Sequence, residues 1–303
     1  MRGLWRGILV LAISTGVASA QRGPGFDIDF DQVQVRTEHV AGQVHVLAGA
    51  GGNLGVFAGE DGIFLVDDQF APLTGRIREA IAAISGEPIR FIINTHFHDD
   101  HTGGNENFGE AGTLIVAHDN VRRTLAAPHF IETVNTEFPA FAQSGLPVIT
   151  FADAVTFHLN GEEVEVFHTP SAHTDGDAIV YFRGSDVIHM GDIFRSRGPV
   201  FDRHNGGSLQ GMIAASDLVL SMMGADTRVI PGHGRVSGRE DLLRARDSMV
   251  VVRDRIAAGV AAGKTLGEII AENPTEGFDW SSPRLLTLER VIEWIYLELS
   301  EER

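Results

Sequence analysis

The chain has 303 residues, 43% of them hydrophobic, which is enough for one large domain or two moderate ones with packed cores. Its formal net charge of −17 opposes contacts with phosphate backbones and anionic membrane surfaces, so we expect no nucleic-acid partner. Cysteine is absent, so the chain has neither disulfides nor a thiolate metal ligand.

The first twenty residues have the order of a secretory signal peptide. Arg2 and Arg6 form a basic start, an apolar stretch follows over residues 7–17, and the small residues Ala18 and Ala20 precede Gln21. This stretch is too short to cross a bilayer, and no later one is long enough. We predict cleavage after Ala20, a periplasmic or secreted mature protein, and no membrane anchoring after cleavage; the oligomeric state stays open.

The first half of the mature chain alternates strand patterns with helical ones. Strands are predicted at residues 33–40, 43–49, 53–59, 62–68, 89–94 and 113–117. Helical spacing is found at residues 73–85 and 118–125.

The second half repeats this order. Strands are predicted at residues 154–160, 162–169, 178–184, 186–192 and 227–232, and helices at 209–223, 239–262 and 283–301. Strands followed by helices, twice over, predict an α/β (α+β) fold with two β-sheets packed face to face and helices outside. No linker divides residues 21–303, so we expect one domain that ends in helices.

Residues 128–147 are broken by prolines yet contain Phe130, Phe138 and Phe141. The pattern predicts a flexible, partly apolar loop. A lid over a site and a helical connection that packs these rings inward are both open interpretations.

Ligand-type side chains gather in the stretch "NTHFHDDHTGGN", directly after the apolar run at residues 89–94. Imidazole nitrogen and carboxylate oxygen suit zinc, and His96 and His98, two residues apart on an extended strand end, can point to one side. Asp100 and His101 follow where a turn can direct them towards a second ion. Three more such residues, His173, Asp192 and His233, stand at strand ends or glycine turns in the second half.

His96, His98, Asp100 and His101 match the HxHxDH signature of the metallo-β-lactamase superfamily, which the chain resembles over nearly all of residues 30–240. The segment at residues 51–68 is similar to the family's opening hairpin and the aspartate after it, here Asp67. The resemblance implies an αββα sandwich with the site along one edge of the sheets.

The resemblance also implies a ligand set and a mechanism. It assigns His96, His98 and His173 to one metal, Asp100, His101 and His233 to a second, and Asp192 to a bridge, while Asp67 orients a ligand imidazole. We expect two Zn²⁺ per chain, with iron and manganese as the alternatives. Two cations that share a water lower its pKa to about 7 or below, which gives a bridging hydroxide, and Asp100 would orient it and take up a proton.

The site alone does not select the substrate. We expect a small-molecule substrate, an ester, lactone, thioester or amide, with weak β-lactamase activity compatible with the site. Arg195 and Arg197 follow Asp192 and are candidates for binding an anionic group of the substrate. An iron-dependent oxidoreductase of the persulfide dioxygenase kind and a non-catalytic metal-binding protein remain alternatives.

Overall fold

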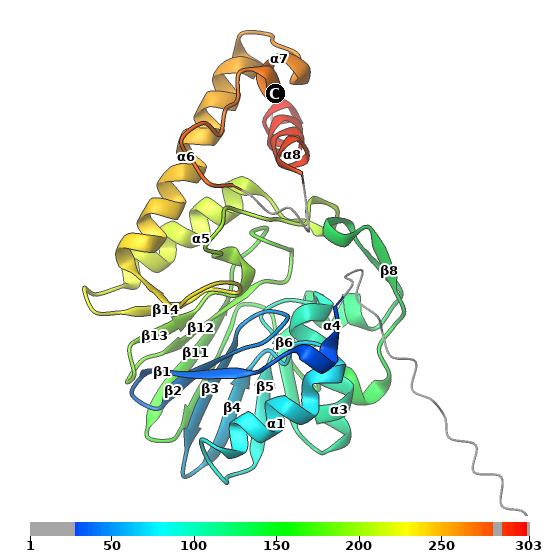
Figure 1. The fold of residues 1–303 in the computed structure, drawn as a ribbon, viewed down its shortest axis with the longest axis vertical. Coiled ribbons are helices and arrows are strands. Elements are labelled where there is room, and N and C mark those ends of the chain that lie inside the picture. Colours follow the sequence, from blue (N-terminus) through cyan, green and yellow to red (C-terminus); the bar gives the residue numbers. More distant parts are fainter. Residues whose placement is uncertain (1–27, 281–286, 302–303) are drawn as a thin grey trace, which may run out of the picture.

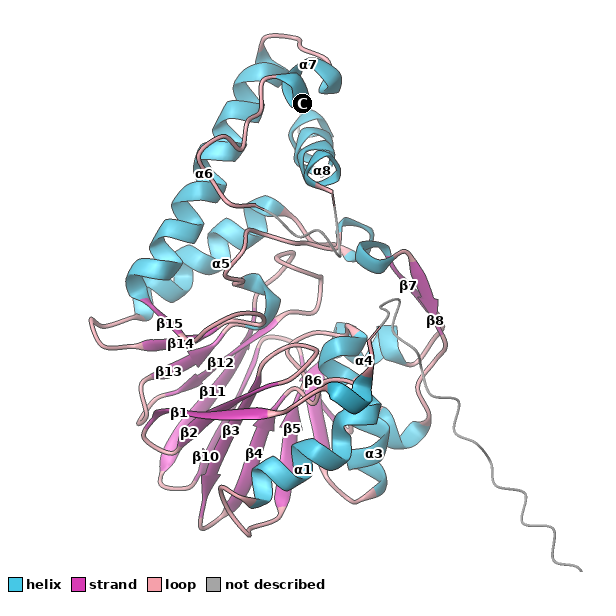
Figure 2. Ribbon diagram, in the orientation of Figure 1, coloured by secondary structure: helices cyan, strands magenta, loops and turns pink. Residues whose placement is uncertain are grey.

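Two β-sheets lie face to face in the computed structural model, which describes residues 28–280 and 287–301 (Figures 1 and 2). The first sheet contains, in spatial order, β1 (Arg36–Ala41), β2 (Val44–Ala48), β3 (Leu54–Gly59), β4 (Gly62–Val66), β5 (Ile89–Ile93), β6 (Leu114–His118) and β9 (Ile149–Phe151). The second contains β10 (Ala154–Leu159), β11 (Glu162–His168), β12 (Ala178–Phe182), β13 (Val187–His189), β14 (Arg228–Ile230) and β15 (Ser237–Gly238).

Helices cover the outer face of each sheet (Figure 2). The first sheet is flanked by α1 (Thr74–Ala82), α2 (Asp99–Thr102), α3 (Asn105–Glu110) and α4 (Asp119–Leu125). The second is covered by α5 (Leu209–Met222) and α6 (Arg239–Ala261), beyond which lie α7 (Leu266–Ala271) and α8 (Leu288–Glu301). The predicted αββα sandwich is therefore confirmed.

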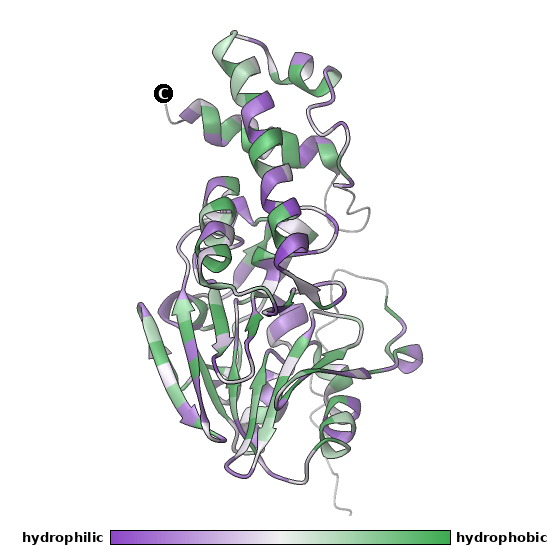
Figure 3. Ribbon diagram, turned by 90° about the vertical axis from the view of Figure 1, so that its left-hand side faces the viewer, coloured by the Kyte–Doolittle hydropathy of each residue, from purple (hydrophilic) through white to green (hydrophobic). Residues whose placement is uncertain are grey.

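Strand residues alternate between two apolar layers. On β4, Phe64 and Val66 pack between the two sheets, whereas Ile63 and Leu65 pack under α1. This alternation buries both faces of β4, which is apolar along its whole length. Figure 3 shows hydrophobic stretches in strands of both sheets.

The segment at residues 128–147 differs from the expected loop. It forms a two-stranded hairpin of β7 (His129–Ile131) and β8 (Thr136–Phe138), followed by a short 3₁₀ helix (Gln143–Gly145). Phe138 and Phe141 are buried in an apolar cluster with Phe97, so the expected inward packing of rings is found without the expected helix.

Two predicted segments fall outside the described residues: the signal peptide at residues 1–20 and the start of the last predicted helix. Among the residues that are described, no helix has the length and apolar character to cross a bilayer.

Candidate metal centre

The ligand-type residues meet at one edge of the two sheets, because the strands that precede them end there. β5 ends just before His96, β11 before His173, β13 before Asp192 and β14 before His233. β5 is parallel to β4 and β6, and β13 is parallel to β14, so side chains that follow these strands leave each sheet at a common edge.

Three imidazoles form the first group of side chains that can hold a metal ion. The ligand atoms of His96, His98 and His173 lie within 4.8 Å of one another, and all three residues are buried. Nδ1 of His98 is 3.0 Å from Nε2 of His173. Nε2 of His96 is buried without a hydrogen-bond partner among the described residues. A buried nitrogen of this kind fits a cation that the three rings surround.

Asp100, His101 and His233 form the second group. Oδ2 of Asp100 is 3.1 Å from Nε2 of His233, and Nε2 of His101 is 3.4 Å from the same nitrogen. His96, His101 and Asp192 form a third group that links these two, and Asp99 belongs to none of the three found in the described part of the chain.

Asp192 lies between the two groups. Its Oδ1 is 3.3 Å from Nε2 of His101 and 3.4 Å from Nε2 of His233, while its Oδ2 is 3.8 Å from Nε2 of His173. One carboxylate therefore faces both sets of imidazoles, which is the arrangement that a bridging ligand needs.

Asp67 orients one ring from each group. Its Oδ2 accepts a hydrogen bond from Nδ1 of His101 at 2.7 Å and another from the hydroxyl of Thr95 at 2.8 Å. That hydroxyl lies 3.0 Å from Nδ1 of His96. Because its own hydrogen is directed at Asp67, the hydroxyl oxygen accepts the hydrogen bond from Nδ1 of His96. In both rings Nδ1 is held by this contact and Nε2 faces the centre, where it can bind a metal in place of a proton.

Hydrogen bonds orient His98 and His173 in the same way. Nε2 of His98 donates to Oδ2 of Asp202 at 3.1 Å, which leaves Nδ1 for a metal. Nδ1 of His173 donates to the carbonyl of Val200 at 2.7 Å, which leaves Nε2. The sequence analysis missed Asp202, which is fully buried and lies ten residues beyond Asp192 in a loop without a recognisable motif.

The two groups differ in electrostatics. Burial lowers the pKa of His173 to about 3 and, together with the neighbouring imidazoles, holds the pKa of His96 well below its usual value. Burial would also lower the pKa of His101, but the carboxylates of Asp100, Asp67 and Asp192 outweigh it and raise that pKa well above its usual value. His96 and His173 are thus neutral donors, whereas His101 attracts positive charge in the form of a proton or a metal cation.

Two glycines allow the backbone to approach the centre closely. A Cβ atom at Gly52 would lie 2.1 Å from Cε1 of His101, and one at Gly232 would lie 2.0 Å from Oδ1 of Asp192. Any side chain at either position would displace a residue of the centre.

A pocket opens beside the centre and includes four of the predicted ligands in its wall: His98, Asp100, His173 and Asp192. Arg195 also lines it, but the guanidinium donates to Oδ2 of Asp192 at 2.7 Å. Arg197 is exposed and lines neither this pocket nor the larger cavity next to it.

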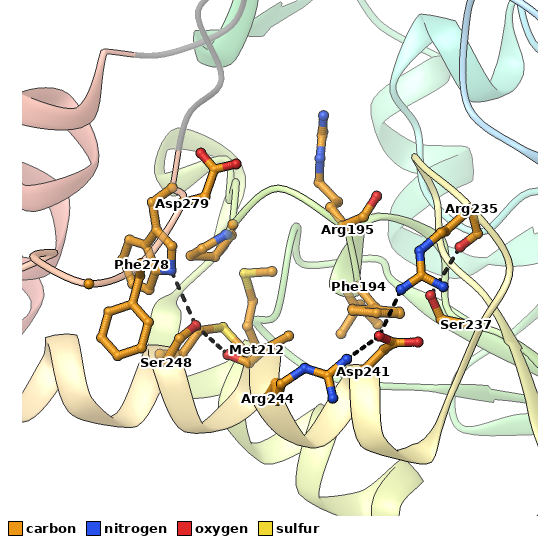
Figure 4. A pocket seen from close by; sticks show the side chains of 18 residues that line it. Phe194, Arg195, Met212, Arg235, Ser237, Asp241, Arg244, Ser248, Phe278 and Asp279 are labelled. Carbon is orange, nitrogen blue, oxygen red and sulfur yellow. Dashed lines mark hydrogen bonds and ion pairs between the residues drawn. The ribbon is translucent and has the colours of Figure 1, made fainter.

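The larger cavity, of about 360 Å³, shares Arg195 with this pocket but contains none of the predicted ligands (Figure 4). Polar groups on its wall pair with one another: Arg235 and Arg244 both bind Asp241, and the indole of Trp280 donates to Ser248. Size alone therefore does not make it the reaction site.

Comparison with known proteins identifies a family and several relatives. The family model of the metallo-beta-lactamase superfamily matches residues 48–233. The chain is 26% identical over 209 residues to a hydroxyacylglutathione hydrolase of Nitrosococcus oceani, an alignment that covers 68% of each chain. It is 25% identical over 190 residues to the 2,4-dinitroanisole O-demethylase subunit alpha of Nocardioides sp., covering 59% of this chain and 54% of the other.

A linear primary-alkylsulfatase of Pseudomonas sp. is 26% identical over 264 residues, covering 69% of this chain and 47% of the sulfatase. The chain thus spans about half the length of this relative and of the demethylase subunit.

Solved structures show the same fold. A sec-alkylsulfatase of Pseudomonas sp. superposes with a TM-score of 0.67 at 18% identity, covering 87% of this chain and 50% of that one. A metallo-beta-lactamase from Pontibacter korlensis superposes with a TM-score of 0.58 at 18% identity, covering 71% of this chain and 99% of that one. Because the family model matches more than half of the chain and the fold agrees, the chain belongs to the metallo-beta-lactamase superfamily.

Proposed function

We propose that the chain is a dinuclear zinc hydrolase that cleaves a small ester, lactone, thioester or amide. The observation that carries the proposal is the convergence of seven ligand-type side chains, in which hydrogen bonds hold four imidazoles with one ring nitrogen facing the centre. Nitrogen and carboxylate donors without sulfur suit zinc, and seven are more than one tetrahedral ion uses.

In this proposal His96, His98 and His173 hold one ion, Asp100, His101 and His233 hold the other, and Asp192 contacts both. Two such ions, when bound, lower the pKa of a shared water to about 7 or below and so supply a nucleophile at neutral pH.

Asp100 is the residue that we expect to handle the proton. Its side chain is about 20% exposed and lines the pocket, so it reaches both the centre and a bound substrate. It can orient the attacking group by accepting a hydrogen bond and then take up the proton released as the tetrahedral species collapses.

We further propose that the protein is exported, on the strength of the basic, apolar and small-residue order of residues 1–20. N-terminal sequencing of protein from the periplasmic fraction should begin at Gln21. A chain that keeps Met1 and stays in the cytoplasm would contradict export without affecting the proposed chemistry.

A hydrolase panel tests the activity. We expect protein loaded with zinc to hydrolyse at least one member of a set of esters, lactones, thioesters, amides, β-lactams and sulfate esters, and an Asp192→Ala variant to lose that activity. Sulfate and thioesters are included because relatives are named as an alkylsulfatase and a hydroxyacylglutathione hydrolase. Protein that purifies with iron and oxidises a persulfide, or binds metal and turns over nothing, would favour one of the two alternatives.

A further inference from the structure

Within the described part of the chain, His233 differs from the other four histidines of the centre, because no hydrogen bond to Nδ1 orients its ring. Its contacts with Asp100, His101 and Asp192 are all made through Nε2. The side chain is also 26% exposed, whereas that of His101 is fully buried. The direction of the His233 ring therefore depends on the backbone turn that carries it, residues 231–234.

Asn53 holds this turn from the opposite sheet. It lies just before β3, and its Nδ2 donates to the carbonyls of Pro231 at 2.8 Å and Gly234 at 2.9 Å, on either side of His233. Its backbone N–H donates to the carbonyl of Gly232 at 2.7 Å. Asn53 is only 5% exposed, so these hydrogen bonds are shielded from water. One residue of the first sheet thus fixes the turn at three carbonyls.

The glycine before Asn53 contacts the other two members of the same group. The backbone N–H of Gly52 donates to the carbonyl of Asp100 at 3.0 Å. Its α-carbon lies against the ring of His101, where no Cβ atom fits. Gln69, which is fully buried, donates through Nε2 to the carbonyl of Gly52 at 2.5 Å and holds this segment in place. The segment therefore contacts two members of the second group and the turn that carries the third.

The first group is joined across the two sheets by different contacts. The N–H of Ala178 donates to the carbonyl of Thr95 at 2.8 Å, and His98 binds Asp202. Within the described residues, no hydrogen bond of Asn53 or of the two glycines before it reaches a histidine of this group. A change at Asn53 should therefore affect the two groups unequally.

We propose that Asn53 is a positioning residue for the second metal ion. It sets the position of His233, which follows the second sheet, relative to Asp100 and His101, which follow the first. This inference rests on the proposed two-metal function and deepens it, because it names a contact on which the affinity of the second site depends. It assigns Asn53 no contact with an ion or a substrate.

A zinc titration in competition with a chelator tests the inference. The wild type should bind two ions, and His233→Ala, which removes a ligand of the second group, should keep the ion of the first group and so identify its affinity. Asn53→Ala removes both side-chain donors. Supporting partners are worth about 10- to 100-fold in metal affinity, so we expect the affinity for the second ion to fall at least about tenfold, with less than about a twofold change for the first.

Asn160→Ala is the matched control. Asn160 also joins the two sheets, because its Nδ2 donates to the carbonyl of Gly62 at 2.9 Å and its Oδ1 accepts from the N–H of Asp61 at 2.8 Å. These contacts join the turn after β3 to the turn after β10, at the strand ends away from the centre. Loss of buried hydrogen bonds should lower the free energy of unfolding in urea for Asn160→Ala, yet both zinc affinities should be unchanged.

Asn53→Ser keeps one hydroxyl donor in place of the amide. It should weaken binding of the second ion less than Asn53→Ala does, and it carries the test if Asn53→Ala does not fold.

The outcomes separate this inference from the function on which it rests. A wild-type chain that binds no second zinc ion would overturn the proposed two-metal function and this inference together. Two unchanged zinc affinities in the folded Asn53 variants would overturn the inference and leave the function in place. An equal loss of both affinities, or the same loss in Asn160→Ala, would also overturn it, because Asn53 would then support the fold in general and not the second site.

Discussion

At the scale of single residues, four histidines of the centre each have one ring nitrogen in a hydrogen bond that points the other nitrogen inward. The partners are different in kind: a carboxylate for His98 and for His101, a hydroxyl for His96 and a backbone carbonyl for His173. Because these partners fix which ring nitrogen faces the centre, folding orients the predicted donors.

Asp100 gives the sharpest test at this scale. Asp100→Asn keeps the volume of the side chain and one oxygen but loses its charge and basicity, so turnover should fall by at least about a hundredfold, as expected when a general base is lost. The fold and the three-histidine group should survive. Turnover is measured on whichever substrate the panel identifies.

Asp99→Asn is the matched control, because Asp99 is the neighbouring buried carboxylate but belongs to none of the ligand groups in the described residues. It should keep most of the activity. An inactive Asp99→Asn beside an active Asp100→Asn would show that the carboxylates have been assigned the wrong way round.

Asp202 should act through His98. Asp202→Ala removes the acceptor for Nε2 of His98, so the ring loses both its fixed tautomer and its orientation. Partners of this kind are worth about 10- to 100-fold in metal affinity, and we expect a loss of that size in a competition titration with a zinc chelator. Unchanged zinc affinity in a folded variant would show that other contacts of His98 suffice.

The sequence indicated the predicted metal ligands more readily than the residues that orient them. His96, His98, Asp100 and His101 form a contiguous motif, and His173, Asp192 and His233 follow strand patterns, so spacing alone indicated where to look. Asp202 lies in a loop, and its contact with His98 joins residues 104 positions apart in the sequence. Local sequence patterns do not reveal a contact over such a separation.

At the scale of elements, the strand ends bring the predicted ligands together, and the short helix α4 is capped by a histidine. His118 ends β6 and caps α4, where its Nδ1 accepts from the backbone N–H of Asn120 at 3.2 Å. Its Nε2 donates to the carbonyl of Ala152, and its ring stacks on His168 with the centroids 3.7 Å apart. Burial and then the charge of His168 lower the pKa of His118 below 6.5.

This shift predicts the pH dependence of stability. A histidine whose pKa is lower in the folded state binds a proton more readily after unfolding, so its contribution is complete above its unfolded pKa and is lost as the pH falls towards the folded value. His118→Asn keeps a capping oxygen but cannot titrate. We expect the free energy of unfolding in urea to fall less for the His118→Asn variant than for the wild type between about pH 7 and pH 5, a range that spans the usual histidine pKa.

His158→Asn serves as the control, because that side chain is 73% exposed and should leave the wild-type slope intact. Equal slopes for the wild type and both variants would show that the stacked pair does not contribute to acid sensitivity.

Element prediction failed where elements are short. The strands of the 129–138 hairpin have three residues each and are flanked by Pro128 and Pro139, so they are too short to show the alternation that identifies a strand. The helix α7 was also missed, although "TLGE" at its start is a capping box in which Thr265 and Glu268 exchange hydrogen bonds. That signal was present in the sequence.

At the scale of the whole molecule, the fold was predictable because the two halves repeat strands followed by helices. Two such sheets bury one apolar face against each other and the other face under helices. The sequence pattern did not predict the contact between the C-terminal helix α8 and the hairpin beside the candidate site. Arg290 of α8 binds Glu132 in the hairpin across 158 residues, so the last helix helps to position the wall of the pocket.

The central claim is that the sheet edges form a centre for two metal ions, and counting the metal tests it most directly. Protein reconstituted with excess zinc and then dialysed should contain about two zinc ions per chain by elemental mass spectrometry, because seven converging donors exceed the four of a single tetrahedral site. An Asp192→Ala variant should retain about one, since the three-histidine group does not need the bridge. A wild-type chain that contains one ion or none after full reconstitution would contradict the account.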